Sequence, residues 1–131
     1  MTAISIILPT YNRAGTIARP IESVRAQNFK DFELIVVDDG SRDQTAQITE
    51  RYPEVRLVQH RTNYGYGAAL KTGFAQSRGT WLGFLDADGT YPPESFPALL
   101  SAGLEQKADL VIGSRMTGTD SEMPTSRRIG N

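Results

Sequence analysis

Two short apolar runs in this sequence each end in a pair of acidic residues. The run ELIVV leads into Asp38 and Asp39, and the run TWLGFL leads into Asp86 and Asp88. Continuous apolar runs rich in β-branched and aromatic residues are typical of strands buried on both faces of a parallel sheet. Parallel strands all end at the same edge of a sheet, and ligands of open α/β sheets bind outside that edge. We therefore expect both acidic pairs to lie at one binding edge.

Strand-like runs alternate with helix-like patterns along the whole sequence. In the helix-like segments apolar residues recur at spacings of three and four, as Ile17, Ile21 and Val24 do. Such alternation is typical of βαβ units, so we expect a three-layer α/β/α fold with a mostly parallel sheet. Strands are predicted at residues 3–9, 32–37, 55–60, 81–85 and 109–113, and helices at residues 16–27, 43–52, 66–77 and 94–106.

Strand order and packing follow from the same pattern. The usual order places the first strand between the second and the fourth, so the loops after the first and fourth strands diverge and leave a crevice. Pro20 predicts that the first helix begins late, because proline is tolerated only in the first turn. The last helix is expected to turn its large apolar residues inward, namely Phe96, Leu99, Leu100 and Leu104.

The composition is that of an ordinary soluble globular domain, with 39% hydrophobic and 22% charged residues in 131. A net charge of −1 disfavours nucleic acid as a partner. The absence of cysteine excludes disulfides and thiolate metal sites. No basic leader precedes the first strand, and no apolar run approaches the roughly 20 residues that span a bilayer. We therefore predict a cytoplasmic chain without a membrane segment of its own.

Charged residues of both signs fall near the predicted crevice. Asp86 and Asp88 are followed by a glycine that permits a turn, so a carboxylate there can hold a divalent cation. Arg115 follows the last predicted strand, and guanidinium groups bind phosphate oxygens in bidentate fashion. Arg127 and Arg128 lie in a polar segment that could close over a diphosphate. Together these residues predict a site for a metal-bound nucleotide.

Six runs support a more specific interpretation: ILPTYNR, VVDDGSRDQT, NYGYGAALKTGF, FLDADGTYPPE, ADLVIGSR and MPTSRRIGN. In this order they resemble the family 2 glycosyltransferases, which have the Rossmann-like GT-A fold of nucleotide-diphospho-sugar transferases. The dolichyl- and polyprenyl-phosphate sugar transferases are the most similar branch. The resemblance implies an inverting transfer from a UDP- or GDP-linked sugar, with Mg²⁺ or Mn²⁺ as cofactor. A lipid-phosphate acceptor such as polyprenyl phosphate needs no general base, whereas a sugar hydroxyl does.

The resemblance also implies roles for individual residues. In such enzymes the loop after the first strand and the second acidic residue after the second strand hold the nucleotide, and the D-x-D run holds ribose and metal–diphosphate. Asp86 and Asp88 would then bind the metal, and Asp88 and Arg115 would act in catalysis. The diphosphate would be held by Arg115, Arg127 and Arg128. The predicted nucleotide-sugar contacts are Pro9, Thr10, Tyr11, Arg13, Asp38, Asp39, Lys71, Asp86, Ala87 and Asp88.

The resemblance suggests a domain organisation as well. Residues 1–116 are expected to form the nucleotide-sugar-binding domain, and residues 117–131 an irregular tail that bears arginines. Proteins of this family run well beyond this length, so we expect the chain to be an N-terminal portion whose tail begins the acceptor half. The longer protein is expected at the cytoplasmic face of the membrane.

Other functions remain open at this point. A receiver-like, Mg²⁺-dependent phosphoacceptor domain has a similar length and clustered aspartates, but its acidic pair follows the first strand. A nucleotidyltransferase would normally carry a Gly-rich loop after the first strand, where this chain has Pro9-Thr10-Tyr11-Asn12. A third alternative is a fragment that binds a nucleotide sugar without turning it over.

The single residues have simpler interpretations too. Asp38 and Asp39 could form only a turn, and the second acidic pair could be solvated. The arginines could form surface ion pairs, which contribute little. Lys71 belongs to a helix face that is more often solvated than ligand-binding. His60 is the only histidine, and at a strand end such a residue is more often structural than catalytic.

Overall fold

The computed structural model describes residues 4–28, 30–84 and 93–114. The chain divides into two compact units, residues 1–82 and residues 83–131. Each unit is considered by itself.

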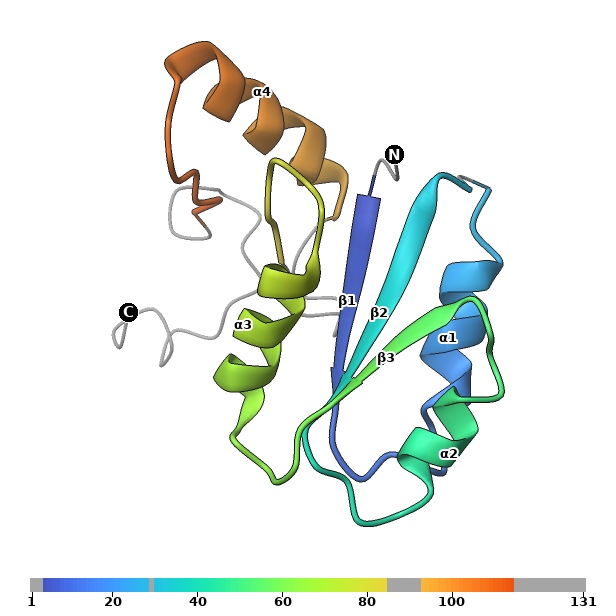
Figure 1. The fold of residues 1–131 in the computed structure, drawn as a ribbon. Coiled ribbons are helices and arrows are strands. Elements are labelled where there is room, and N and C mark those ends of the chain that lie inside the picture. The colour runs from blue at the N-terminus through green and yellow to red at the C-terminus, as the bar shows by residue number, and fades with distance from the viewer. Residues whose placement is uncertain (1–3, 29, 85–92, 115–131) are drawn as a thin grey trace, which may run out of the picture. The chain divides into compact units, whose positions relative to one another are not determined.

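A parallel sheet of three strands forms the centre of the first unit (Figure 1). The strands are β1 (Ile4–Thr10), β2 (Phe32–Asp38) and β3 (Val55–Gln59), in the order β1-β2-β3. Their register places Thr10 opposite Asp38, and Asp38 opposite Gln59, so all three strands end at one edge. The predicted parallel α/β arrangement is confirmed for these strands.

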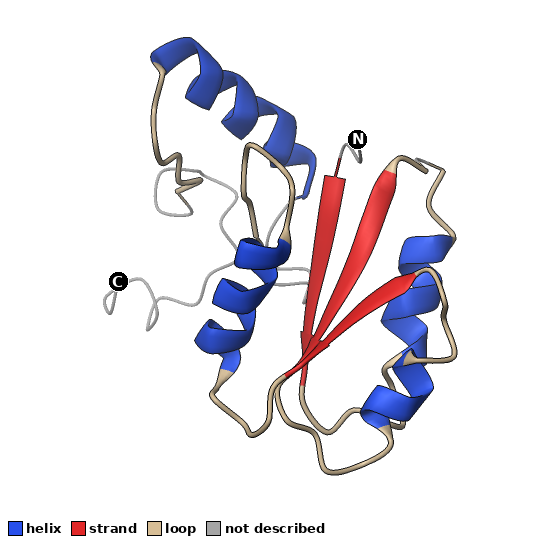
Figure 2. Ribbon diagram, in the orientation of Figure 1, coloured by secondary structure: helices blue, strands red, loops and turns tan. Residues whose placement is uncertain are grey.

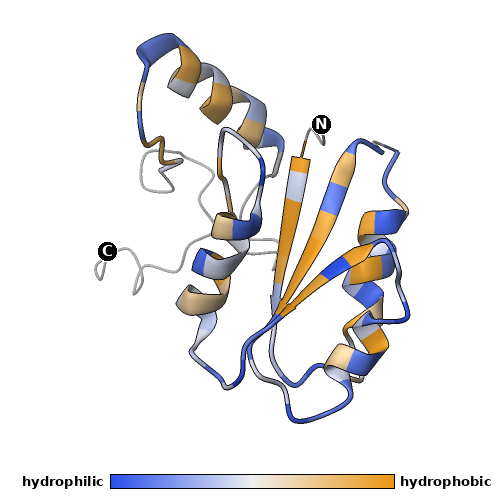
Figure 3. Ribbon diagram, viewed as in Figure 1, coloured by the Kyte–Doolittle hydropathy of each residue, from blue (hydrophilic) through white to orange (hydrophobic). Residues whose placement is uncertain are grey.

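Helices cover both faces of this sheet (Figure 2). They are α1 (Ala18–Arg25), α2 (Thr45–Thr49) and α3 (Tyr66–Gln76). Alternate residues of β2 serve the two faces, because successive side chains of a strand point in opposite directions. Leu34 and Val36 pack with Ile21 of α1 on one face, whereas Ile35 and Val37 pack with Ala69 of α3 on the other. The strands are therefore mostly apolar, as their orange colour in Figure 3 shows.

The helix boundaries follow local chemistry. Helix α1 begins at Ala18, so Pro20 lies in its first turn as predicted. Helix α2 is shorter than expected and begins at Thr45, whose N–H donates to Asp43 Oδ1 at 3.0 Å. Asp43 Oδ2 accepts from the Ala14 N–H at 3.0 Å, which joins the two loops. The hydrogen bond from the Thr45 hydroxyl is the largest influence that lowers the pKa of Asp43.

The second unit contains a short 3-10 turn, η1 (Pro93–Ser95), followed by α4 (Phe96–Gln106). These elements confirm the predicted helix at residues 94–106. The expected inward packing is wrong for the described residues, because Phe96, Leu100 and Leu104 are exposed and Leu99 is half-buried. No strand of this unit is described against which the apolar residues could pack.

Two predicted strands are also wrong where the structure describes them. Residues 81–84 and 109–113 have no strand geometry, and Leu110 and Ile112 are each 75% exposed. A strand needs a neighbour to receive its backbone hydrogen bonds. Among the described residues, these segments have no such neighbour. Nor does any described helix have the length and apolarity to cross a membrane.

Candidate functional site

The candidate site lies at the carboxyl edge of the three-stranded sheet. Thr10 ends β1, Asp38 ends β2, and His60 follows β3 directly. The Asp39 N–H donates to the Thr10 carbonyl at 2.9 Å, and the His60 N–H donates to the Asp38 carbonyl at 2.9 Å. These bonds extend the strand pairing by one residue and bring the three chain segments together.

Asp38 organises the loop that follows β2. It is 1% exposed and accepts hydrogen bonds from the Ser41 N–H at 3.0 Å and from the Ser41 hydroxyl. Ser41 in turn accepts from the Asn12 N–H at 2.8 Å, which joins this loop to the loop after β1. Gly40, in the loop after β2, has φ +75°, and a Cβ at this residue would lie 2.4 Å from the Thr62 carbonyl carbon. The close approach of the loops after β2 and β3 therefore requires glycine.

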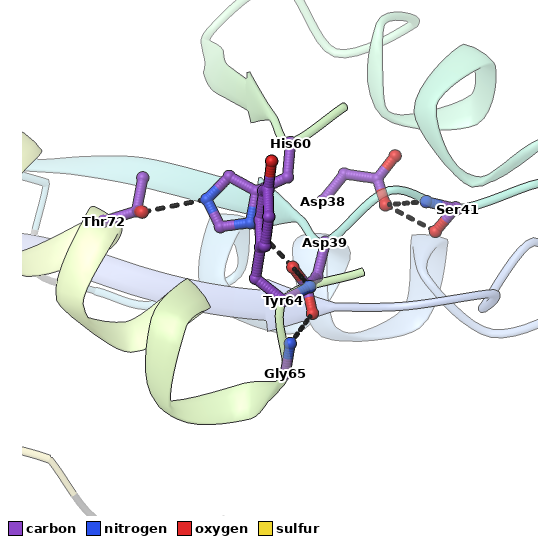
Figure 4. Close-up of polar contacts among 7 residues, drawn as sticks. All are labelled: Asp38, Asp39, Ser41, His60, Tyr64, Gly65 and Thr72. Carbon is purple, nitrogen blue, oxygen red and sulfur yellow. Dashed lines mark hydrogen bonds and ion pairs between the residues drawn. The ribbon is translucent and has the colours of Figure 1, made fainter. Parts of the chain in front are cut away.

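Asp39 makes contacts on the other side of β2 (Figure 4). It is 3% exposed, and its Oδ1 accepts from the Tyr64 N–H at 2.9 Å and lies 2.7 Å from His60 Nδ1. Its Oδ2 accepts from the Gly65 N–H at 2.7 Å. Burial raises the pKa of Asp39, but these hydrogen bonds outweigh it, so the pKa lies below its ordinary value. Asp39 is thus a buried carboxylate that stays ionised.

His60 connects this carboxylate to α3. Its Nε2 lies 2.8 Å from Thr72 Oγ1, and its ring meets that of Tyr64 edge to face, with centroids 5.3 Å apart. The expectation of a structural histidine agrees with these contacts. The pairing of His60 with Asp39 was not predicted. The available signal was the expected parallel arrangement of the strands, and the register of the structure places the residue after β3 beside the residues after β2.

The remaining predicted contacts of the first unit lie around the same edge. Pro9 pairs with Val37 within the sheet, and the Thr10 hydroxyl is buried with no hydrogen-bond partner among the described residues. Tyr11 is 39% exposed. The Arg13 N–H donates to Thr45 Oγ1 at 2.7 Å, while its side chain is exposed. Lys71 is exposed on α3.

A polar hollow of about 180 Å³ opens between the loops after β1, β2 and β3. Asp38, Tyr11 and His60 line it together with residues from both flanking loops. The other lining residues are Gly40, Ser41, Arg42, Gln59, Arg61, Thr62 and Asn63. Nearly all of its lining residues are polar, and they include one aspartate and two arginines, so the hollow suits a polar or charged ligand rather than an apolar one.

The other predicted site residues lie outside the described part of the chain. They are Asp86, Ala87, Asp88, Arg115, Arg127 and Arg128. The convergence of Asp39 and Asp88 therefore stays a prediction, as does the metal site at Asp86 and Asp88. Within residues 4–28, 30–84 and 93–114, no group of three or more His, Asp or Glu side chains could hold a metal ion.

The fold and this edge belong to a known class of proteins. The family model of glycosyl transferase family 2 matches residues 5–130, so the chain belongs to that family of transferase enzymes. The strand order β1-β2-β3 agrees, because β2 pairs with both neighbours as in the common 3-2-1-4-5-6 order. A receiver-like domain has the order 2-1-3-4-5, in which the first strand takes that place. The phosphoacceptor alternative is therefore wrong.

Individual relatives can be named. The chain is 34% identical over 125 residues to an uncharacterised glycosyltransferase, alr2836, of Nostoc, covering 87% of this chain and 39% of the relative. It is 37% identical over 129 residues to an undecaprenyl-phosphate 4-deoxy-4-formamido-L-arabinose transferase of Pseudomonas fluorescens, covering 92% of this chain and 37% of the relative. The chain thus spans less than half the length of these relatives.

Solved structures show the same fold. TarS of S. aureus superposes with a TM-score of 0.62 at 31% identity, over 95% of this chain and 23% of TarS. TarS has also been solved with UDP-GlcNAc, with a TM-score of 0.60 at 28% identity, over 87% of this chain and 38% of that one. The mannosyltransferase PcManGT of Pyrobaculum calidifontis, solved with GDP-Man and Mn²⁺, superposes with a TM-score of 0.54 at 28% identity, over 57% of this chain and 24% of PcManGT. The fold is accordingly GT-A.

Proposed function

We propose that this chain forms the nucleotide-sugar-binding part of an inverting glycosyltransferase. The polar hollow at the carboxyl edge of the sheet carries the proposal, because Asp38, Tyr11 and two arginines line it where α/β sheets bind ligands. Its volume of about 180 Å³ is below the roughly 300–1,000 Å³ of sites that enclose a whole ligand. We therefore assign it to one part of the donor, with the rest extending along the edge.

The proposed donor is a UDP- or GDP-linked sugar. TarS binds UDP-GlcNAc and PcManGT binds GDP-Man, which supports this class of donor. In our proposal Pro9, Thr10 and Tyr11 contact the nucleotide, and the Thr10 hydroxyl, which has no hydrogen-bond partner among the described residues, is assigned a hydrogen bond to it. A carboxylate offers about four acceptor positions, and described residues occupy three of those of Asp39, so we assign the fourth to the nucleotide.

The metal and the acceptor belong to the same proposal. PcManGT was solved with Mn²⁺, which supports Mn²⁺ or Mg²⁺ as cofactor, with Asp86 and Asp88 as its predicted ligands. Such an ion stabilises negative charge on a leaving diphosphate, and Arg115, Arg127 and Arg128 would add fixed positive charge. The undecaprenyl-phosphate relatives support a polyprenyl phosphate acceptor. Action at the cytoplasmic membrane face is part of the same proposal.

Calorimetric titration tests the donor assignment. UDP, GDP, UDP-glucose and GDP-mannose are titrated with and without Mn²⁺, using the full chain, Asp88→Asn and the matched control Asp120→Asn. We expect Mn²⁺-dependent binding that Asp88→Asn weakens at least tenfold and the control leaves unchanged. Equal binding by all three proteins would remove Asp88 from the site, and no binding of any of the four ligands would refute the proposal.

A transfer assay tests the chemistry. With a labelled sugar donor and polyprenyl phosphate we expect a lipid-linked product, and NMR of its anomeric centre should show inversion. Retention of configuration would contradict the mechanism. Donor binding without any transfer would support the alternative of a non-catalytic nucleotide-sugar-binding fragment.

A further inference from the structure

The contacts of Asp39 share one feature that its predicted role as a nucleotide contact does not explain. All three donors come from the ends of one loop, His60 at its start and Tyr64 and Gly65 at its end. Between them lie residues 61–63, which line the polar hollow. A single buried carboxylate therefore closes the loop that forms one wall of the hollow.

We propose that Asp39 and His60 act as a clamp that positions residues 61–63 and thereby determines how tightly the donor nucleotide binds. Both are positioning residues in this role, since they act through the wall of the hollow. The inference rests on the proposed function for its ligand, but the clamp itself is a property of the described contacts.

Thr72 completes the clamp on the side of α3. The imidazole Nδ1 faces a carboxylate, which has no hydrogen when ionised, so Nδ1 carries the hydrogen. Nε2 then pairs with the Thr72 hydroxyl at 2.8 Å, and a hydroxyl can serve as donor or acceptor. With a partner on each nitrogen, the ring of His60 is held in one orientation. The loop is thus attached to β2 through Asp39 and to α3 through Thr72.

The wall formed by residues 61–63 also contacts the loop after β2 on the opposite side of the hollow. Gly40 lies so close to Thr62 that a Cβ at residue 40 would meet the Thr62 backbone, so the two loops are in contact at this point. Outward movement is limited by the clamp at residues 60, 64 and 65. Arg61 and Asn63, on either side of Thr62, line the hollow from a loop that is held at both ends and in its middle.

The surroundings of Asp39 stabilise its ionised form, and this form accepts the hydrogen bonds that make up the clamp. A buried carboxylate is costly unless hydrogen bonds compensate it, and Asp39 has three. His60 is the titratable side chain that bonds to it among the described residues. Asp38 bonds to Ser41 instead, and the Tyr64 ring packs on His60. Protonation of Asp39 would open the clamp, and its lowered pKa keeps that event at acidic pH.

Two substitutions of His60 separate this proposal from a merely structural role. Asparagine places an amide N–H near the position of Nδ1 and keeps the bond to Asp39, whereas glutamine reaches the position of Nε2 and keeps only the contact with Thr72. We expect His60→Gln to weaken UDP or GDP binding at least tenfold, and His60→Asn by less than about threefold. Binding is measured by calorimetry on the full chain.

A double-mutant cycle shows whether the effect passes through the wall. If His60 acts through residues 61–63, His60→Gln should cost little in an Asn63→Ala background, because coupled residues are not additive. The pH below which nucleotide binding is lost, here called the acid limit, should also be higher in His60→Gln than in the native chain. The reason is that the His60 hydrogen bond is one of the influences that lower the Asp39 pKa.

Three results of the binding measurements would overturn the clamp. They are equal weakening by asparagine and glutamine, additive effects of His60→Gln and Asn63→Ala, or an unchanged acid limit in His60→Gln. Should His60→Gln not fold, Thr72→Val takes its place in the cycle with the same expectation. A ¹⁵N NMR spectrum of the imidazole tests the clamp without any nucleotide: we expect a protonated, exchange-protected Nδ1. Protection without nucleotide binding would refute the proposed function alone, and an unprotected Nδ1 would refute the clamp alone.

Discussion

Two glycines of α3 should respond to the same substitution with opposite signs. A Cβ at Gly73 would lie 2.2 Å from Ile7 Cγ2, 3.2 Å from Ile7 Cγ1 and 3.3 Å from Ile7 Cβ, whereas a Cβ at Gly67 would meet nothing within 4 Å. Carbon atoms normally approach to about 3.5–4.0 Å, so Gly73→Ala requires a movement of about 1.3 Å or more. Ile7 is β-branched and stiff at χ1, so it cannot simply rotate away.

The magnitudes follow from these distances. Replacing a glycine in the middle of a helix by alanine favours folding by roughly 0.5–1 kcal/mol, and Gly67→Ala, in the first turn of α3, should show at most that gain. Overpacking costs typically about 1–3 kcal/mol. With the contact at 2.2 Å we take the upper part of that range, so Gly73→Ala should be about 1–2 kcal/mol less stable than the native chain. The two variants should therefore differ by roughly 1–3 kcal/mol in the free energy of unfolding.

Urea unfolding followed by circular dichroism measures this difference, and a third variant tests its cause. In an Ile7→Ala background the opposing atoms Cγ1 and Cγ2 are absent, so adding Gly73→Ala should be neutral or stabilising. If Gly73→Ala is as stable as Gly67→Ala, or if its cost persists without the Ile7 side chain beyond Cβ, the packing of α3 on β1 described here is wrong.

Three further predictions concern the carboxyl edge of the sheet. Gly40→Ala should destabilise the fold by more than about 2 kcal/mol in urea unfolding, because it combines φ +75° with a clash at Thr62; an unchanged midpoint would contradict it. Asp39→Asn should be less stable than the native chain at pH 7, but the gap should narrow as the pH falls below 3.8, since a lowered carboxyl pKa contributes stability that is lost in acid; a gap independent of pH would refute this. Thr45→Val should lower the free energy of unfolding by about 1–3 kcal/mol, because it leaves the Arg13 N–H without its acceptor. Calorimetric unfolding measures this loss, and a neutral result would show that water replaces the hydroxyl.

The parts of the fold that could be predicted are those that depend on local pattern. Strand β2 is an apolar run with an acidic end, and both properties follow from burial between two helical layers. Helix α3 follows from the spacing of its apolar residues, and the late start of α1 from Pro20. The position of Asp38 and Asp39 at the carboxyl edge of the sheet could also be predicted, since it requires only that the strands be parallel.

What escaped prediction depends on contacts between distant residues. The pairing of His60 with Asp39 needs the register of β2 and β3, and the close approach of Gly73 to Ile7 needs the packing of a helix on a strand. Residues 81–84 and 109–113 carry strand-like composition, yet composition alone supplies no neighbouring strand. For the same reason the apolar residues of α4 could be recognised, but their burial could not be inferred.

The two adjacent aspartates differ in what they hold, and the period of the strand explains why. Asp38 follows the parity of Leu34 and Val36, which face α1, and its carboxylate bonds to Ser41 in the loop toward α2. Asp39 follows the parity of Ile35 and Val37, which face α3, and its carboxylate bonds to the loop that begins α3. Successive side chains of a strand point to opposite faces, so two consecutive carboxylates at a strand end reach both helical layers. One loop from each layer is thereby attached to the end of the same strand, and the polar hollow lies between these loops.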